Sequence, residues 1–203
     1  MIVVKASVEE LIASFAQAWP LQELKTRADA TGFHALGTWL KAHRDERRID
    51  PWSLDNPGTG AYAFWQDGAW AVLSDRTHIL TADQDALAAL SRRFGLVLVF
   101  DVESTAEVAE FMAFDGGRRI RAIRSLSDRT TTSGRKLWRE LGIPIRHNFM
   151  NETERLQRRF GITPWDKLPD DMAFKAVAFV DRQDCTESQA SFMARLAEVT
   201  AAR

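Results

Sequence analysis

The chain contains a single cysteine, Cys185, among its 203 residues. One thiol can form neither an intramolecular disulfide nor a zinc site built from several cysteines, which favours a protein of a reducing compartment. Asp184 and Glu187 lie close to Cys185 in the sequence and oppose formation of its thiolate. Cysteine chemistry is therefore not expected to carry the function.

Long apolar runs are also absent. No stretch approaches the roughly 18 apolar residues that a membrane-spanning helix needs. The N-terminus has no basic region, and Glu9 and Glu10 follow its short apolar run, which argues against a secretory signal. A formal net charge of -1 gives the whole molecule no attraction for a polyanion or a membrane surface. We therefore expect a cytoplasmic protein with no membrane partner.

The familiar catalytic and cofactor-binding motifs are missing. No His-x-x-x-His or His-Glu-x-x-His pattern links the four histidines, which are His34, His43, His78 and His147. The serines do not occur in Gly-x-Ser-x-Gly, and the glycines match neither a P-loop nor a dinucleotide-binding fingerprint. The sequence predicts no catalytic residues, no bound metal and no cofactor, and it favours a binding protein over an enzyme.

The composition is that of a globular protein, with 45% hydrophobic and 27% charged residues. This length suits a single domain over residues 1–203. A turn-rich stretch at residues 49–60 separates a mainly helical N-terminal portion, residues 1–50, from an α+β sheet core, residues 61–203. We expect an α+β fold whose mixed or mainly antiparallel sheet is built from hairpins and flanked by helices.

Local patterns place the elements of the N-terminal portion. A short strand at residues 2–6 leads into a helix that begins with a capping box of Ser7 and Glu10 and buries one apolar face through Trp19. Two further helices are predicted, at residues 21–30 and 33–48.

In the sheet core, Thr81 or Asp83 can cap a helix that ends at residue 94. The continuous apolar run at residues 96–100 is typical of a strand covered on both faces. The remaining predictions are a polar loop at 126–132, a short helix at 135–141, a helix at 151–160 capped by Asn151, a strand at 172–180 and a helix at 186–202.

Two Asp-Gly pairs predict hairpins, and the first places two tryptophans together. With Asp67 and Gly68 at the centre of a type I′ turn, Trp65 lies opposite Trp70. Such an aromatic pair either stabilises the hairpin or offers an exposed platform to a partner. The first of these interpretations is the simpler one.

The second hairpin has a register that matches charges. With Asp115 and Gly116 at the centre of the turn, three favourable pairs form: Phe111 with Ile120, Glu110 with Arg121, and Glu107 with Arg124. A turn at Gly116 and Gly117 would instead place Glu110 opposite Ile123 and lose this match. The sequence therefore favours the turn at Asp115 and Gly116.

Two acidic residues, Asp101 and Glu103, follow the buried strand and share one of its faces. Together with His147 they define the alternative function, a metal-dependent enzyme or a nucleic-acid-processing protein. Solvation of the strand end is the simpler explanation of these carboxylates.

Arginine is abundant between residues 118 and 139. Phosphate binding needs several uncompensated cations on one face, whereas the expected register pairs Arg121 and Arg124 with glutamates. Nucleic-acid binding is therefore disfavoured, and an acidic protein partner is the other use for these charges. Most of the seven tryptophans are expected in the core, but tryptophan is also enriched at interface hot spots, which adds support for a partner-binding surface.

Residues 62–161 run in the order aromatic hairpin, helix, apolar strand, hairpin and later helix, and include the segments WQDGAWAVLSD, LVLVFDVES and FDGGRRIRAI. In these segments and in their order the chain resembles bacterial immunity proteins of polymorphic-toxin and type VI secretion systems. The resemblance implies a protein that binds and neutralises one cognate toxin without chemistry of its own. The contact residues expected are Trp65, Trp70, Glu107, Glu110, Arg119 and Arg121. A self-associating structural protein, a homo-oligomer, is a third interpretation.

Overall fold

The computed structural model describes residues 1–19, 22–43, 59–75, 78–103, 107–126, 129–145 and 149–181. The strands in these ranges are β1 (Ile2–Val4), β2 (Gln22–Thr31), β3 (Thr59–Asp67), β4 (Trp70–Ser74), β5 (Val97–Glu103), β6 (Val108–Asp115), β7 (Arg118–Leu126), β8 (Arg129–Gly134) and β9 (Ala173–Asp181). The helices are α1 (Val8–Ala18), α2 (Gly32–His43), α3 (Ile79–Ala82), α4 (Gln84–Phe94) and α5 (Met150–Phe160), with 3₁₀ turns η2 (Trp138–Glu140) and η3 (Trp165–Lys167).

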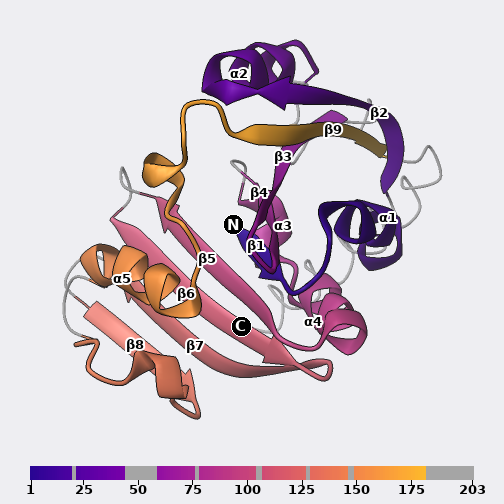
Figure 1. Ribbon diagram of the computed structural model, residues 1–203. Helices are drawn as coiled ribbons and strands as arrows, with labels where there is room; N and C mark the ends of the chain where they lie inside the picture. The colour runs from indigo at the N-terminus through magenta and orange to yellow at the C-terminus, as the bar shows by residue number, and fades with distance from the viewer. Residues whose placement is uncertain are drawn as a thin grey trace, which may run out of the picture.

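These strands form one sheet in the order β2-β9-β3-β4-β1-β5-β6-β7-β8, and each described pair is antiparallel. The sheet twists so strongly that β2 and β9 run across the direction of β5 to β8 (Figure 1). Helices lie against both faces. The α+β class with an antiparallel sheet built from hairpins is confirmed.

The core consists of two apolar layers, one on each face of the sheet. Val97 and Val99 of β5 pack into the layer covered by α1 and α4, while Leu98 and Phe100 of the same strand pack into the layer covered by α2 and α5. This alternation follows from the two-residue period of a strand. It confirms that this apolar strand is covered on both faces.

Helix α1 begins as the sequence predicts. The Ser7 hydroxyl accepts a hydrogen bond from the Glu10 backbone N–H at 3.2 Å, and the Glu10 carboxylate accepts one from the Ser7 backbone N–H at 2.8 Å. These hydrogen bonds from Ser7, that from its backbone first, hold the pKa of Glu10 below its usual value. On the buried face, the ring of Phe15 stacks on Phe179 with centroids 3.8 Å apart.

The prediction of a helix at residues 21–30 is wrong, because this segment is strand β2. Its Glu, Lys and Ala content favours a helix locally, but β2 pairs with β9 from Gln22↔Asp181 to Thr31↔Ala173. The ladder of hydrogen bonds to a distant strand outweighs the local preference. The first 50 residues thus supply an edge strand, β2, and a central strand, β1, to the sheet.

Later elements follow the predictions in part. Helix α4 is capped by Asp83, whose side chain accepts from the Ala86 N–H at 3.0 Å, and strand β9 occupies the expected place. The predicted loop at residues 126–132 is wrong, because β8 begins at Arg129 and pairs with β7. The short helix predicted at 135–141 is reduced to η2, and α5 has Phe149 at its N-cap in place of Asn151. The predicted helix at 186–202 and residues 44–58 lie outside the described residues.

The register predicted for the first hairpin is wrong. Asp67 pairs with Trp70 and Trp65 pairs with Val72, so Gly68 and Ala69 form the turn. Gly68 has φ +58°, which fits a type II′ turn with glycine at its first central position. The Asp67 carboxylate accepts hydrogen bonds from the backbone N–H and the hydroxyl of Thr163, at 2.5 and 3.2 Å, and so belongs to a tertiary contact.

The turn predicted for the second hairpin is also wrong. Gly116 and Gly117 occupy its centre with φ of +55° and +85°, and a type I′ turn requires positive φ at both positions. A bulge at Ile120 then shifts the register. The observed pairs are Phe111↔Ile123, Ala113↔Arg121 and Glu110↔Arg124, in place of the three that the sequence predicted. The bulge therefore restores an acid–base pair for Glu110 with a different arginine.

Candidate functional site

The two tryptophans expected at a partner surface lie in the core. Trp65 is 1% exposed and Trp70 is 6% exposed. The Trp70 indole N–H donates to the carbonyl oxygen of Phe160 at 3.0 Å, and the Trp65 ring contacts that of Trp165 with centroids 5.2 Å apart. Both side chains lie on one face of the hairpin but not opposite each other. Neither forms an exposed platform.

Arg121 is also buried, and it forms an ion pair with Glu140. Its Nε lies 3.0 and 3.1 Å from the two carboxylate oxygens of Glu140, and its Nη2 lies 2.9 Å from Oε2. Its Nη1 donates to the carbonyl oxygens of Ser133 and Gly134, and Glu140 also accepts from the Leu137 N–H at 2.9 Å. Arg121 therefore holds η2 against β7 and the end of β8, and it is not a surface contact.

The other three expected contact residues lie in different surroundings. Glu107 and Arg119 are exposed, and Arg119 donates to the side-chain oxygen of Gln84 at 2.9 Å. Glu110 is partly buried, and burial raises the pKa of its carboxyl even though Arg124 lies opposite. With half of the predicted set inside the protein, the hairpin edge does not form one contact surface.

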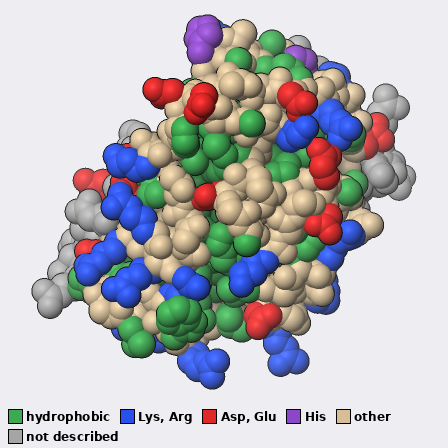
Figure 2. Space-filling model, viewed as in Figure 1, with side chains coloured by type: hydrophobic (Ala, Val, Ile, Leu, Met, Phe, Trp, Pro, Cys, Tyr) green, Lys and Arg blue, Asp and Glu red, His purple; other side chains and the backbone are tan. Residues whose placement is uncertain are grey.

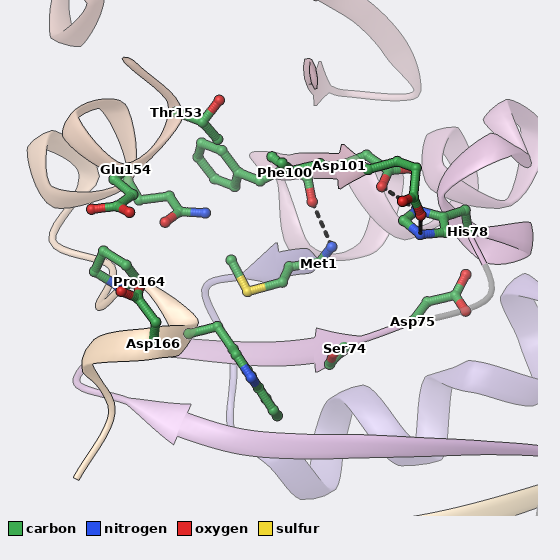
Figure 3. Close-up of a pocket in the computed structure, with 14 residues that line it drawn as sticks. Met1, Ser74, Asp75, His78, Phe100, Asp101, Thr153, Glu154, Pro164 and Asp166 are labelled. Carbon is green, nitrogen blue, oxygen red and sulfur yellow. Dashed lines mark hydrogen bonds and ion pairs between the residues drawn. The ribbon is translucent and has the colours of Figure 1, made fainter. Parts of the chain in front are cut away.

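A pocket of about 730 Å³ lies between the ends of β4 and β5, beside Met1, the residue that precedes the intervening strand β1. Figure 3 shows Phe100 and Asp101 on one side of it, Ser74 and Asp75 on the other, and Thr153 and Glu154 of α5 at its far end. Its lining side chains come from β4, β5, α5, the segment around η3 and the turn before α3: Met1, Ser74, Asp75, His78, Phe100, Asp101, Val102, Glu103, Thr153, Glu154, Gln157, Pro164, Trp165 and Asp166.

His78 joins the two carboxylates that the sequence singled out. Its Nδ1 contacts the Asp101 carboxylate, and its Nε2 lies 3.3 Å from Glu103. The Thr81 hydroxyl donates to the other oxygen of Asp101 at 2.7 Å, and Asp75 accepts from the Leu80 N–H at 2.6 Å. His78 itself has φ +60°, a conformation that costs a non-glycine residue about 1–3 kcal/mol and that these contacts hold in place.

This geometry says what His78 can do. A neutral imidazole has one N–H donor, whereas both of its ring nitrogens here face carboxylate oxygens. Only the imidazolium can donate to Asp101 and Glu103 together. The His78 ring thus lies between the two carboxylates and links them at this end of the pocket.

The alternative function, a metal-dependent enzyme or a nucleic-acid-processing protein, was predicted from Asp101, Glu103 and His147. Asp101 and Glu103 come together at the pocket, while His147 lies outside the described residues. The described residues contain no group of three or more His, Cys, Asp or Glu side chains arranged to hold a metal ion. Sequence reasoning missed His78 because it has no motif partner nearby, and Asp101 lies 23 residues further along the chain.

The pocket lining is acidic. Five of its side chains are carboxylates, Asp75, Asp101, Glu103, Glu154 and Asp166. Two of them form ion pairs with residues beside the lining, Asp166 with Lys167 at 2.6 Å and Glu154 with Arg158 at 3.1 Å. The Met1 ammonium also lines the pocket, and it donates to the Phe100 carbonyl oxygen at 2.6 Å. Burial lowers the pKa of this ammonium, while Asp101 and Asp75 act in the opposite direction.

The pocket also has apolar walls. Among the lining residues, Trp165 is half-buried and Val102 is 40% exposed, whereas Phe100 and Pro164 are buried. Carboxylates combined with aromatic rings suit an organic cation with an apolar stem, because the charge meets the carboxylates while the stem packs on the rings. Lysine and arginine side chains have this chemistry.

The comparisons with known proteins found no matching family model, no matching curated protein and no matching solved structure. Among the described residues, no helix is long and apolar enough to cross a membrane.

Proposed function

We propose that the protein acts by binding another protein, and that the acidic pocket receives a basic side chain of that partner. The observation that carries the proposal is the set of five carboxylates in a concave lining that also contains the half-buried Trp165. Complementary charge would steer the partner to this site and fix its orientation. The resemblance to immunity proteins narrows the partner to a cognate toxin with a basic surface.

The position of the carboxylates supports this proposal. Glu154 of α5 and Asp166 of η3 are exposed at one end of the pocket, and the Glu103 side chain is 43% exposed at the other. Asp101 is more deeply placed, with 18% of its side chain exposed. A guanidinium or ammonium group would therefore meet carboxylates at the mouth before it reaches the aromatic wall. The succession of carboxylates from the mouth to the interior favours entry of a long basic side chain and disfavours an anion.

The contacts of His78 favour binding over catalysis. Its two ring nitrogens face Asp101 and Glu103, which brings both carboxylates together at the end of the pocket where a basic side chain would bind. The described lining residues include two with hydroxyl groups, Ser74 and Thr153, and the Thr153 hydroxyl donates to the Phe149 carbonyl oxygen at 3.0 Å. A binding role accounts for the arrangement without a reaction.

The direct test is to express the open reading frame next to this gene alone and together with this chain. The proposal predicts that the neighbour is toxic alone, that co-expression restores growth and that the two proteins co-purify. A neighbour that is harmless, or a chain that neither restores growth nor co-purifies with it, would contradict the toxin-binding proposal.

A variant pair tests the site separately. Glu154→Lys with Asp166→Lys reverses two exposed charges at the pocket mouth and should weaken the complex at least about tenfold, as for truncated hot-spot residues. Glu23→Lys makes the same kind of change on the exposed edge strand β2 and should leave affinity unchanged. If all of these variants bind like the parent protein, the complex forms elsewhere and the pocket is not the site.

A further inference from the structure

A second feature of the molecule is an exposed tryptophan outside the pocket lining. Trp138 of η2 is 71% exposed, and Leu141, which ends this 3₁₀ turn, is 60% exposed. The Leu141 N–H donates to the Trp138 carbonyl oxygen at 3.2 Å, which closes the turn. Since residues three apart in a 3₁₀ turn project on the same side, the two side chains form one apolar patch. Neither residue lines the pocket.

Basic side chains surround this patch. The guanidinium of Arg139 lies over the Trp138 ring, 4.4 Å from its centroid, and also contacts the carbonyl oxygen of Arg159 on α5. Arg135 and Lys136 immediately precede the turn and are exposed. Figure 2 shows hydrophobic surface bordered by lysine and arginine side chains in the lower part of the view, where Figure 1 places β8 and the segment after it. We call these residues, Arg135, Lys136, Trp138, Arg139 and Leu141, the Trp138 surface.

The patch is held rigidly from beneath. Glu140, between Arg139 and Leu141 in the sequence, is 1% exposed and points inward to its ion pair with Arg121. The only carboxylate of η2 is therefore used inside the protein, and the side chains that η2 presents outward are apolar or basic. A rigid exposed indole loses little conformational entropy on binding, which is one reason for its enrichment at interface hot spots.

From this arrangement we infer that the Trp138 surface docks an acidic segment of a protein, with an apolar side chain of that segment against Trp138 and Leu141. An apolar centre with a charged rim is the usual anatomy of a protein interface, and the sign of the rim specifies carboxylates in the partner. Nucleic acid fits less well. Arg139 already covers one face of the indole, and two nearby α5 arginines, Arg155 and Arg158, are paired with Glu152 and Glu154.

This inference stands independently of the pocket, because it uses other residues and the opposite charge. The experiment is fluorescence anisotropy of the full chain with a labelled synthetic peptide that alternates glutamate and leucine. A polyglutamate peptide of equal length tests charge alone, and an oligothymidylate of equal charge tests nucleic acid. Trp138→Ala and Lys136→Glu should each weaken binding of the alternating peptide about tenfold or more.

Two matched controls report on non-specific effects. Leu24→Ala removes another exposed apolar side chain, on β2, and Lys41→Glu reverses an exposed charge on α2; both should bind the peptide like the parent protein. Because Trp138 and Lys136 are exposed, their variants should also melt at the temperature of the parent protein.

Three results would overturn the inference. The first is no binding of the alternating peptide, or binding that both variants leave unchanged. The second is polyglutamate binding as tightly as the alternating peptide, which would show that the apolar patch plays no part. The third is tighter binding of the oligothymidylate through the same residues, which would assign the surface to nucleic acid.

Discussion

The pocket and the Trp138 surface differ in how each uses its carboxylates. In the pocket, Asp101 and Glu103 remain at the surface of a hollow, held close together by His78. At the Trp138 surface the carboxylate of Glu140 is turned inward to Arg121, so that basic side chains remain outside. The formal net charge of -1 conceals this separation. The positions of the charged side chains therefore say more about possible partners than the net charge of the chain does.

The largest expected effect comes from breaking the buried ion pair. Glu140→Ala leaves the guanidinium of Arg121 buried without its partner and should lower the free energy of unfolding by about 3–5 kcal/mol. Urea denaturation measures this change. The double variant Arg121→Met with Glu140→Leu should recover much of the loss, because no unpaired charge remains. A single variant as stable as the parent would show that the pair does not hold η2 in place.

The next largest loss of stability should come from a steric clash at Gly134, at the end of the strand that precedes the Trp138 surface. Gly134 has φ +77°, and a Cβ at this position would lie 2.2 Å from the Ile120 carbonyl oxygen at the bulge. Gly134→Ala should cost more than the roughly 1–2 kcal/mol that a left-handed conformation alone costs an L-residue.

Gly68→Ala is the matched control for Gly134→Ala. Gly68 has φ +58°, and no atom lies within 4 Å of the position that a Cβ would take, so this variant should lose only the free energy that its backbone conformation costs. Equal losses in the two variants, measured by thermal unfolding, would contradict the close approach of β8 to the bulge.

The smallest effect is a dependence on pH at Glu110, which lies opposite Asp101 in the β5–β6 ladder. Burial raises the pKa of Glu110, so the folded state holds its proton more strongly than the unfolded chain. This contribution to stability is present at low pH and is lost as pH rises from the ordinary carboxyl range through the raised pKa. Glu110→Gln removes the dependence.

Denaturation of the parent protein and the Glu110→Gln variant across this range measures the effect. The stability difference should shift in favour of the variant as pH increases. A shift in the opposite direction would show that Arg124, whose charge lowers the pKa, outweighs burial at this site.

The parts of the fold that sequence reasoning found depend on neighbours in the chain. The capping box of Ser7 and Glu10, the cap of α4 at Asp83 and the apolar strand β5 are of this kind. Strand β2 was missed because its partner, β9, is far away in the sequence. The arginine–glutamate matching in the second hairpin was misassigned because two glycines satisfy the turn better than Asp115 and Gly116.

The candidate sites were also hard to predict, because they depend on contacts between residues far apart in the sequence. His78 meets Asp101 and Glu103 only because the chain returns to the sheet after α4. The exposure of Trp138 depends on Glu140 turning inward to Arg121, a residue on β7. Among the tryptophans, the sequence singled out Trp65 and Trp70, which are buried, since nothing local distinguishes a core indole from an exposed one.

The most direct test of the account uses two tryptophans as reporters in one ¹H–¹⁵N correlation spectrum. Trp165 lines the pocket, and Trp138 lies at the basic surface. Titration with ethylguanidinium, which mimics an arginine side chain, should shift the indole N–H signal of Trp165 saturably and leave that of Trp138 in place. Sodium chloride at equal ionic strength should move neither signal. An unmoved Trp165 signal, or equal shifts at both tryptophans, would contradict a pocket that selects a basic side chain.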